Sequence, residues 1–212
     1  EATVKQLRNH PCILYWTIFN EGWGQFDADE CFRICKENDP TRLIEDNSPC
    51  NRDHVVTDVN TWHSYVAGYG WDQRVEDICN STYKGSKHNY IGGFVQTGVP
   101  MMNSECGNVW GISGNSSESD ISWQYKYMMN EFRLHDKLCG FVFTEFHDVV
   151  NEFNGYYKID NGDKDFGYDL YGMTLKDLHS QDYLGCDFAP MTTVKVGDEI
   201  SVPLFGSSFT DV

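Results

Sequence analysis

The chain has 212 residues, 40% of them hydrophobic and 15% aromatic, which suffices for a sizeable core in one large domain or two small ones. Its 32 acidic residues outnumber the 16 basic ones, and the formal net charge of −16 would repel phosphate backbones and anionic lipid headgroups. No apolar run approaches the roughly 18 to 20 residues of a membrane span. We therefore expect neither a nucleic-acid partner nor a membrane partner.

The start of the sequence and its cysteines bear on whether the chain is part of a longer protein and on its cellular compartment. It begins in a helical pattern with no basic-then-apolar leader, so we expect a piece of a longer protein. The chain is far larger than a disulfide-stapled mini-domain, and we interpret its cysteines mainly as reduced core residues. These features favour a cytoplasmic location, with secretion left open. The eight cysteines are Cys12, Cys31, Cys35, Cys50, Cys79, Cys106, Cys139 and Cys186.

The first 50 residues alternate between helix and strand patterns. Residues 3–9 look like the end of a helix, which His10-Pro11 breaks before the apolar strand at 13–19. Residues 27–37 form an amphipathic helical pattern, and 42–48 is a short strand. Cys31 and Cys35 lie one helical turn apart in this helix, but no second close pair completes a zinc site. We therefore expect no metal and no cofactor.

The alternation continues toward the C-terminus. Residues 54–65 form another strand pattern, and a long loop-and-helix region follows it. Pro100 opens the strand at 100–107 from a position where its missing N–H does little harm. The last buried strand is expected within 139–149. Between them, Ser119 or Asp120 can cap a helix whose apolar face would consist of Ile121, Tyr125, Met128, Met129 and Phe132.

The strand patterns indicate an α/β fold. Strands that are continuous hydrophobic runs and alternate with helices are typical of a parallel sheet covered on both faces. We count five such strands, beginning at about residues 13, 42, 55, 100 and 140. An eight-stranded (β/α)8 TIM barrel typically needs about 250 residues, and a doubly wound sheet can be built from fewer. The fold is therefore either an open sheet or the second half of a barrel.

Polar residues at the expected strand ends indicate a catalytic site. Asn20-Glu21 ends the first strand, His63-Ser64-Tyr65 the third, and Ser104-Glu105 the fourth. Isolated acids at strand ends are usually solvated or cap the next helix. Two carboxylates projected toward one mouth are, however, what glycosidic bond cleavage requires, one as proton donor and one as nucleophile or base. Their combination with a histidine and tryptophans at neighbouring ends favours a site.

Several segments resemble one enzyme family. "LRNHPCILYWTIFNEGWG" resembles the acid/base signature of glycoside hydrolase family 2, the β-galactosidase, β-glucuronidase and β-mannosidase family. "DPTRLI", "DVNTWHSY", "VPMMNSECG" and "FVFTEFHDVVNEFNGYYKIDNG" follow in the order of that family's fifth to eighth strands. The resemblance covers about residues 5–165. It implies that the five strands are strands 4 to 8 of a (β/α)8 TIM barrel.

The resemblance also implies roles for individual residues. Glu21 would be the general acid/base and Glu105 the nucleophile of a retaining enzyme. Asn20 would hydrogen-bond the sugar 2-OH. His63 and Tyr65 match a strand-six His-Ser-Tyr and would line the sugar subsite, and Tyr65 would also donate to Glu105.

Aromatic residues complete the expected sugar site. Trp23, Trp62 and Trp110 lie just past strand ends, where an indole face can stack on a sugar ring, although ordinary packing explains each one equally well. Phe143 stands where the family often has Trp, or in some branches Tyr. Cys106 follows the expected nucleophile, where an aromatic residue is usual. The chain lacks the Asn-x-Lys tripeptide of resembling β-glucuronidases, which favours a neutral sugar.

These observations predict a domain order and a function. Residues 1–182 would form a partial TIM-barrel catalytic domain, and 183–212 a linker and the beginning of a β-sandwich domain with a turn at Gly197-Asp198. The function would be that of a retaining exo-β-glycosidase, most similar to a β-galactosidase, acting on a carbohydrate substrate. A non-catalytic carbohydrate-binding relative and a fragment that is inactive alone are the alternatives. A homo-oligomer of the full-length protein is left open.

Overall fold

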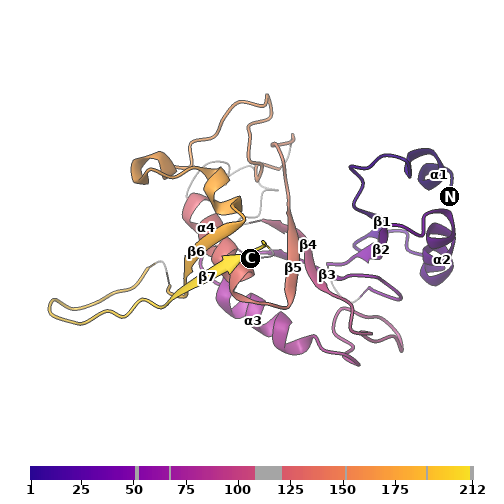
Figure 1. Ribbon diagram of the computed structural model, residues 1–212, viewed down its shortest axis with the longest axis horizontal. Helices are drawn as coiled ribbons and strands as arrows, with labels where there is room; N and C mark the ends of the chain where they lie inside the picture. Colours follow the sequence, from indigo (N-terminus) through magenta and orange to yellow (C-terminus); the bar gives the residue numbers. More distant parts are fainter. Residues whose placement is uncertain (51–52, 67, 108–120, 151, 190, 211–212) are drawn as a thin grey trace. The chain divides into compact units, whose positions relative to one another are not determined.

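The computed structural model describes residues 1–50, 53–66, 68–107, 121–150, 152–189 and 191–210 (Figure 1). The chain divides into two compact units. Among the residues described, no helix is long and apolar enough to cross a membrane. The first unit consists of Glu1–Ser64, Ile78–Cys106 and Lys137–Val142, and the second of Tyr65–Asp77, Gly107–Asp136 and Phe143–Val212.

The first unit begins with helix α1 (Ala2–Leu7), strand β1 (Tyr15–Asn20), helix α2 (Ala28–Asn38) and strand β2 (Leu43–Ser48). All four elements were predicted within a few residues of these bounds. Strands β1 and β2 pair in parallel, which brings their carboxyl ends together. A small core joins these elements, and it contains Val4, Cys35, Ile44, Trp16, Ile18 and Phe32.

Strand β1 is less buried than its sequence predicted. None of its six residues is buried, although Tyr15, Trp16, Ile18 and Phe19 are partly covered. Within the described part of the chain β1 is hydrogen-bonded only to β2, so its other edge has no strand beside it. Apolar composition predicted the strand correctly, but burial depends on neighbours that composition does not specify.

A second sheet has the strand order β3 (Asn60–Tyr65), β4 (Met101–Gly107) and β5 (Leu138–Phe143), which is also their order along the chain. The Asn60 N–H donates to the Pro100 carbonyl at one end, and the Val66 N–H to the Gly107 carbonyl at the other. Because both residue numbers increase together, β3 and β4 run in the same direction.

Strand β3 begins later than the predicted 54–65. The Asp46 carboxylate accepts the backbone N–H groups of Val55 and Val56, at 2.6 and 3.1 Å, and the Thr57 hydroxyl donates to the Val59 carbonyl. Side chains therefore satisfy the backbone groups that a strand would have used for pairing. The expectation of a strand over 54–59 was wrong for this reason.

The second unit contains helix α4 (Ile121–Leu134), whose buried face includes Tyr125, Met128 and Phe132 as predicted. Helix α3 (Trp71–Ser81) lies partly in this unit, and two 3-10 helices, η2 (Tyr168–Tyr171) and η3 (Leu175–His179), follow β5. The predicted cap at Ser119 or Asp120 lies outside the described residues.

The end of the chain forms an antiparallel pair of strands. Strand β6 (Asp182–Cys186) pairs with β7 (Leu204–Ser208), and both contact α4. In the connection between them, the predicted turn is present: the Asp198 N–H donates to the Lys195 carbonyl, and Gly197 has a φ of +96°. That this segment opens a β-sandwich domain stays a prediction.

The cysteines follow the sequence expectation only in part. All eight are free thiols, as predicted. Burial agrees with a core position for Cys35, Cys79 and Cys106, but Cys12, Cys50 and Cys139 are exposed. The interpretation as core residues was wrong for these three, because an apolar neighbourhood in sequence does not place a residue on the inner face of its element.

Candidate active site

Glu21 stands in a tight turn at the end of β1. Its own φ is +53°, and those of Gly22 and Gly24 are +73° and +65°, so the chain turns sharply where the strand ends. The Glu21 N–H donates to the Ser48 carbonyl at 2.7 Å, and the Gly22 N–H to Asn47 Oδ1 at 3.0 Å. The turn that carries this carboxylate is therefore fastened to the carboxyl end of β2.

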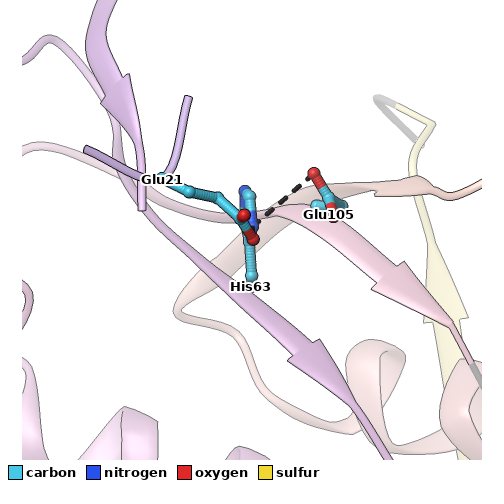
Figure 2. A group of neighbouring side chains, drawn as sticks. All are labelled: Glu21, His63 and Glu105. Atoms are coloured by element: carbon cyan, nitrogen blue, oxygen red, sulfur yellow. Dashed lines mark hydrogen bonds and ion pairs between the residues drawn. The ribbon is translucent and has the colours of Figure 1, made fainter. Parts of the chain in front are cut away.

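Three predicted site residues meet around one imidazole, as Figure 2 shows. His63 Nδ1, on β3, lies 3.0 Å from Glu21 Oε1 and 3.5 Å from Glu105 Oε2, on β4. One oxygen of each carboxylate and this nitrogen all lie within 4.8 Å of one another. The His63 side chain is buried, whereas those of Glu21 and Glu105 keep 29% and 24% exposure. Both carboxylates therefore retain a face for a ligand.

The other side of the imidazole is held by protein groups. His63 Nε2 lies 2.6 Å from Ser48 Oγ at the end of β2, and the Ser48 hydroxyl donates to Ser104 Oγ on β4 at 2.8 Å. The backbone N–H of His63 donates to the Pro49 carbonyl at 2.9 Å. His63 is thus held from the end of β2, and Ser104 on β4 supports Ser48. Ser104 was noted in the sequence only as the neighbour of Glu105, and Ser48 was not singled out. The signal for Ser48 was a run of polar residues within an otherwise buried strand.

The surroundings of the two carboxylates are negatively charged. Although Cys50 is exposed, partial desolvation raises the pKa of its thiol, and the charges of Glu21, Asp53 and Glu105 raise it further. The side chain of Asp53 also lies beside Gly22, since a Cβ there would meet its carboxylate carbon at 3.5 Å. Within the described chain, Glu21, His63 and Glu105 are also the residues whose ligating atoms come close enough to share a cation. The absence of a metal in the functional protein stays a prediction.

The remaining predicted site residues of the first unit differ in their positions. Asn20 is the exposed last residue of β1. Trp23 is 78% exposed, and its indole N–H points to Glu21 Oε2 at 3.4 Å, so this side chain does lie at the site. Trp62 is buried next to His63 on β3, and consecutive strand residues point to opposite faces. The structure therefore does not bring the Trp62 side chain to the carboxylates.

Three further predicted site residues are not tested by the geometry of the first unit. Tyr65 and Phe143 belong to the second unit, where Phe143 is buried with its ring centre 5.0 Å from that of Tyr125 and 4.6 Å from that of Tyr156. Trp110 lies outside the described residues. A role for these three in sugar binding stays a prediction.

Comparison with known proteins identifies the family. The family model described as "Glycosyl hydrolases family 2, TIM barrel domain" matches residues 1–177. The chain belongs to glycosyl hydrolase family 2. This membership explains the parallel strands and helices as part of a TIM-barrel domain, as the resemblance predicted.

Known relatives match this family 2 chain over limited lengths. Beta-galactosidases of Yersinia enterocolitica and Yersinia pestis are 43% identical to it over 42 residues, which is 20% of this chain and 4% of each relative. The chain thus spans a small part of the relatives it matches.

Solved structures share the fold with this family 2 chain. A GH2 beta-galacturonidase from Eisenbergiella tayi bound to galacturonate matches 77% of the chain and 33% of its own length, with a TM-score of 0.59 and 17% identity. Bacteroides uniformis beta-glucuronidase 2 matches 86% of the chain and 26% of its own length, with a TM-score of 0.55 and 15% identity. At these identities the likeness shows the fold alone.

Proposed function

We propose that the protein containing this chain is a retaining exo-β-glycosidase, with Glu21 as general acid/base and Glu105 as nucleophile. One observation carries the proposal: two partly exposed carboxylates, on the ends of different strands, converge on His63 with an oxygen of each within 4.8 Å of the other. In this assignment β1 to β5 are strands 4 to 8 of the family's barrel.

The separation of the carboxylates supports retention over inversion. Retaining enzymes hold their two carboxyl groups about 5 to 5.5 Å apart, whereas inverting enzymes need about 6.5 to 9.5 Å to admit a water molecule. One oxygen of Glu21 and one of Glu105 lie within 4.8 Å of each other, which is nearer to the retaining separation than to the inverting one. Direct attack by Glu105 on the sugar is the chemistry that this spacing favours.

The mechanism follows from these roles. Glu21 gives its proton to the leaving oxygen while a Glu105 oxygen bonds to the anomeric carbon and the glycosidic bond breaks. Water then attacks the same carbon, its proton returns to Glu21, and the bond to Glu105 breaks. Asn20, the residue before Glu21, would bond the sugar 2-OH, and Tyr65 would donate to Glu105. Trp23, exposed beside Glu21, offers a stacking face.

The charge of the site favours a neutral sugar such as a galactoside. Glu21, Glu105 and Asp53 all lie near Cys50, and a uronate carboxylate entering among them would be repelled. The named activity of the Yersinia relatives is that of beta-galactosidases, in agreement with this choice.

Azide rescue of two variants of the full-length protein tests the roles. In Glu105→Ala, azide should enter the vacated space and yield a glycosyl azide of inverted configuration. In Glu21→Ala, an activated nitrophenyl glycoside should still form the covalent intermediate, which azide then releases with retained configuration. The product configurations are read by NMR. Exchanged configurations would exchange the two roles, and a wild-type protein that binds sugars but cleaves none of a panel of nitrophenyl glycosides would favour the non-catalytic alternative.

A further inference from the structure

A continuous chain of side chains runs behind the two carboxylates. It leads from Ser104 on β4 through Ser48 on β2 and His63 on β3 to Glu21. The two serines and His63 are buried, with at most 8% exposure. Each hydrogen bond in this chain joins two side chains. The choice of donor in one bond therefore constrains the choice of donor in the next.

The serine pair fixes which ring nitrogen of His63 carries hydrogen. The Ser48 hydroxyl donates its hydrogen to Ser104 Oγ at 2.8 Å, so toward His63 it offers only lone pairs. A contact of 2.6 Å with His63 Nε2 is then favourable only if Nε2–H is the donor. In the neutral imidazole, the lone pair of Nδ1 consequently faces the carboxylates.

This arrangement places one proton between Nδ1 and Glu21. With a neutral imidazole, Nδ1 at 3.0 Å from Glu21 Oε1 needs a hydrogen between the two atoms that Glu21 carries, whereas an imidazolium would carry that hydrogen on Nδ1 and leave Glu21 ionised. The distance of 3.5 Å to Glu105 Oε2 exceeds the usual range of about 2.7 to 3.2 Å for such a bond, so Glu105 does not take part in sharing it. The opposite tautomer would donate from Nδ1 and favour an ionised Glu21.

We propose that Ser48, supported by Ser104, is a positioning residue that sets the tautomer and ring orientation of His63, so that Nδ1 accepts the acid proton of Glu21. The inference rests on the proposed function, because it concerns how Glu21 is kept ready as the acid. In glycosylation this proton moves from Glu21 to the leaving oxygen, and in deglycosylation a water proton replaces it. His63 ends the cycle with the hydrogens it had at the start.

Leaving-group dependence in the full-length protein separates this role from simple structural support. Ser48→Ala and Ser104→Ala should each lower kcat about tenfold or more for an alkyl glycoside, whose departure needs protonation. For a dinitrophenyl glycoside, which needs little protonation, kcat should fall by less than about twofold, with KM unchanged for both substrates. Ser48→Thr, which keeps the hydroxyl, should restore the alkyl glycoside rate.

Ser86→Ala is the matched control. It also removes a buried serine hydroxyl from the first unit, but one that bonds the Ser81 carbonyl and the His88 N–H, and it should change neither rate. Equal losses for both substrates in Ser48→Ala and Ser104→Ala would overturn the proposal.

Crystal structures of the same variants test the geometry without any activity. In Ser48→Ala the His63 ring should turn away from its position 3.0 Å from Glu21, because Nε2 has lost its acceptor, whereas in Ser104→Ala it should stay. A ring that is unmoved in Ser48→Ala would also overturn the proposal. An inactive wild-type protein would instead contradict the proposed function and leave this structural comparison to decide the role of Ser48.

Discussion

Two of the carboxylate–histidine pairs described in the first unit are alike in composition and opposite in surroundings. Asp46 and His54 are completely buried, with Asp46 Oδ1 2.7 Å from His54 Nδ1. Glu21 and His63 are 3.0 Å apart, but Glu21 keeps 29% of its side-chain exposure. Burial, rather than the identity of the residues, distinguishes the two pairs.

The difference lies in how much hydrogen-bonding capacity the fold itself uses. Asp46 accepts from His54 and from the backbone N–H groups of Val55 and Val56, which leaves it no exposed face. On Glu21, one oxygen contacts His63, and among the described residues the other has a 3.4 Å contact with the exposed Trp23. A buried carboxylate whose oxygens accept hydrogen bonds from the protein supports the fold. A partly exposed carboxylate with fewer protein hydrogen bonds is available to a substrate.

The largest effect expected from this comparison is on turnover. Glu105→Ala should lower kcat roughly 10⁴-fold or more, because the nucleophile is lost, while the thermal midpoint stays within a few degrees of wild type. Nitrophenyl glycoside kinetics and thermal unfolding of the full-length protein measure the two quantities. Unfolding of this variant together with its loss of activity would place Glu105 with the structural carboxylates.

The next largest effect is on stability. Asp46→Ala should lower the free energy of unfolding by about 3 to 5 kcal/mol, because it leaves His54 and two backbone N–H groups buried without their acceptor. Chemical denaturation gives the value. Glu37→Ala is the control, since it removes an exposed carboxylate paired with Arg33 and should cost less than about 1 kcal/mol. Equal costs for the two variants would show that burial does not separate the pairs.

The second unit contains a third kind of carboxylate, which is buried and has a raised pKa. Glu131 is buried on α4, and burial, followed by the charges of Asp187, Asp72 and Glu76, raises its pKa to about 7. Since the folded state favours the protonated form, its contribution to stability is complete below pH 4.5 and is lost as the pH rises through about 7.

Replacement of this acid by its neutral isostere should remove that pH dependence. Glu131→Gln should be more stable than wild type at pH 8, by on the order of 1 to 3 kcal/mol, and this difference should vanish toward pH 4.5. Denaturation at several pH values measures it. His135, whose pKa is lowered by burial, titrates with the opposite sign, and its Nε2 lies 4.0 Å from Glu131 Oε2, so the comparison is made with His135 replaced by Gln in both proteins. A constant difference across this range would contradict the assignment.

The smallest effect concerns the two tryptophans. Trp23→Ala should weaken substrate binding by about 0.5 to 1.5 kcal/mol and leave stability unchanged, because the indole is exposed beside Glu21. Trp62→Ala should instead lower stability, because this side chain is buried on β3. KM values and unfolding midpoints distinguish the two. A reversed outcome would exchange their assignments.

Much of the architecture was predictable because it depends on local patterns. Apolar runs gave β1 and β4, helical periodicity gave α2 and α4, and Asn20-Glu21 marked the end of a strand. The prediction of a strand at 54–59 failed because His54 makes only an isolated bridge to Tyr90, while side chains bond the backbone of Val55, Val56 and Val59. The local sequence does not show whether side chains or a neighbouring strand will bond these backbone groups.

The site was predictable in its carboxylates but not in its supports. The positions of Glu21, His63 and Glu105 followed from motifs, and these three do converge. Ser48 and Ser104, and the Asp46–His54 pair, act through contacts between residues 8 to 56 positions apart in the chain. Buried polar residues within a strand are the general signal for such contacts, but their partners depend on the fold.

The left-handed backbone of Glu21 has a consequence for selection on stability. A φ of +53° costs a residue with a side chain about 1 kcal/mol relative to glycine, and asparagine tolerates it better than glutamate. A library screened only for heat resistance should therefore enrich Glu21→Gly and Glu21→Asn, both of which remove the carboxylate. Thermostable clones that have lost turnover are the expected product of such a screen, and thermal engineering of this domain needs activity as a second criterion from its first round.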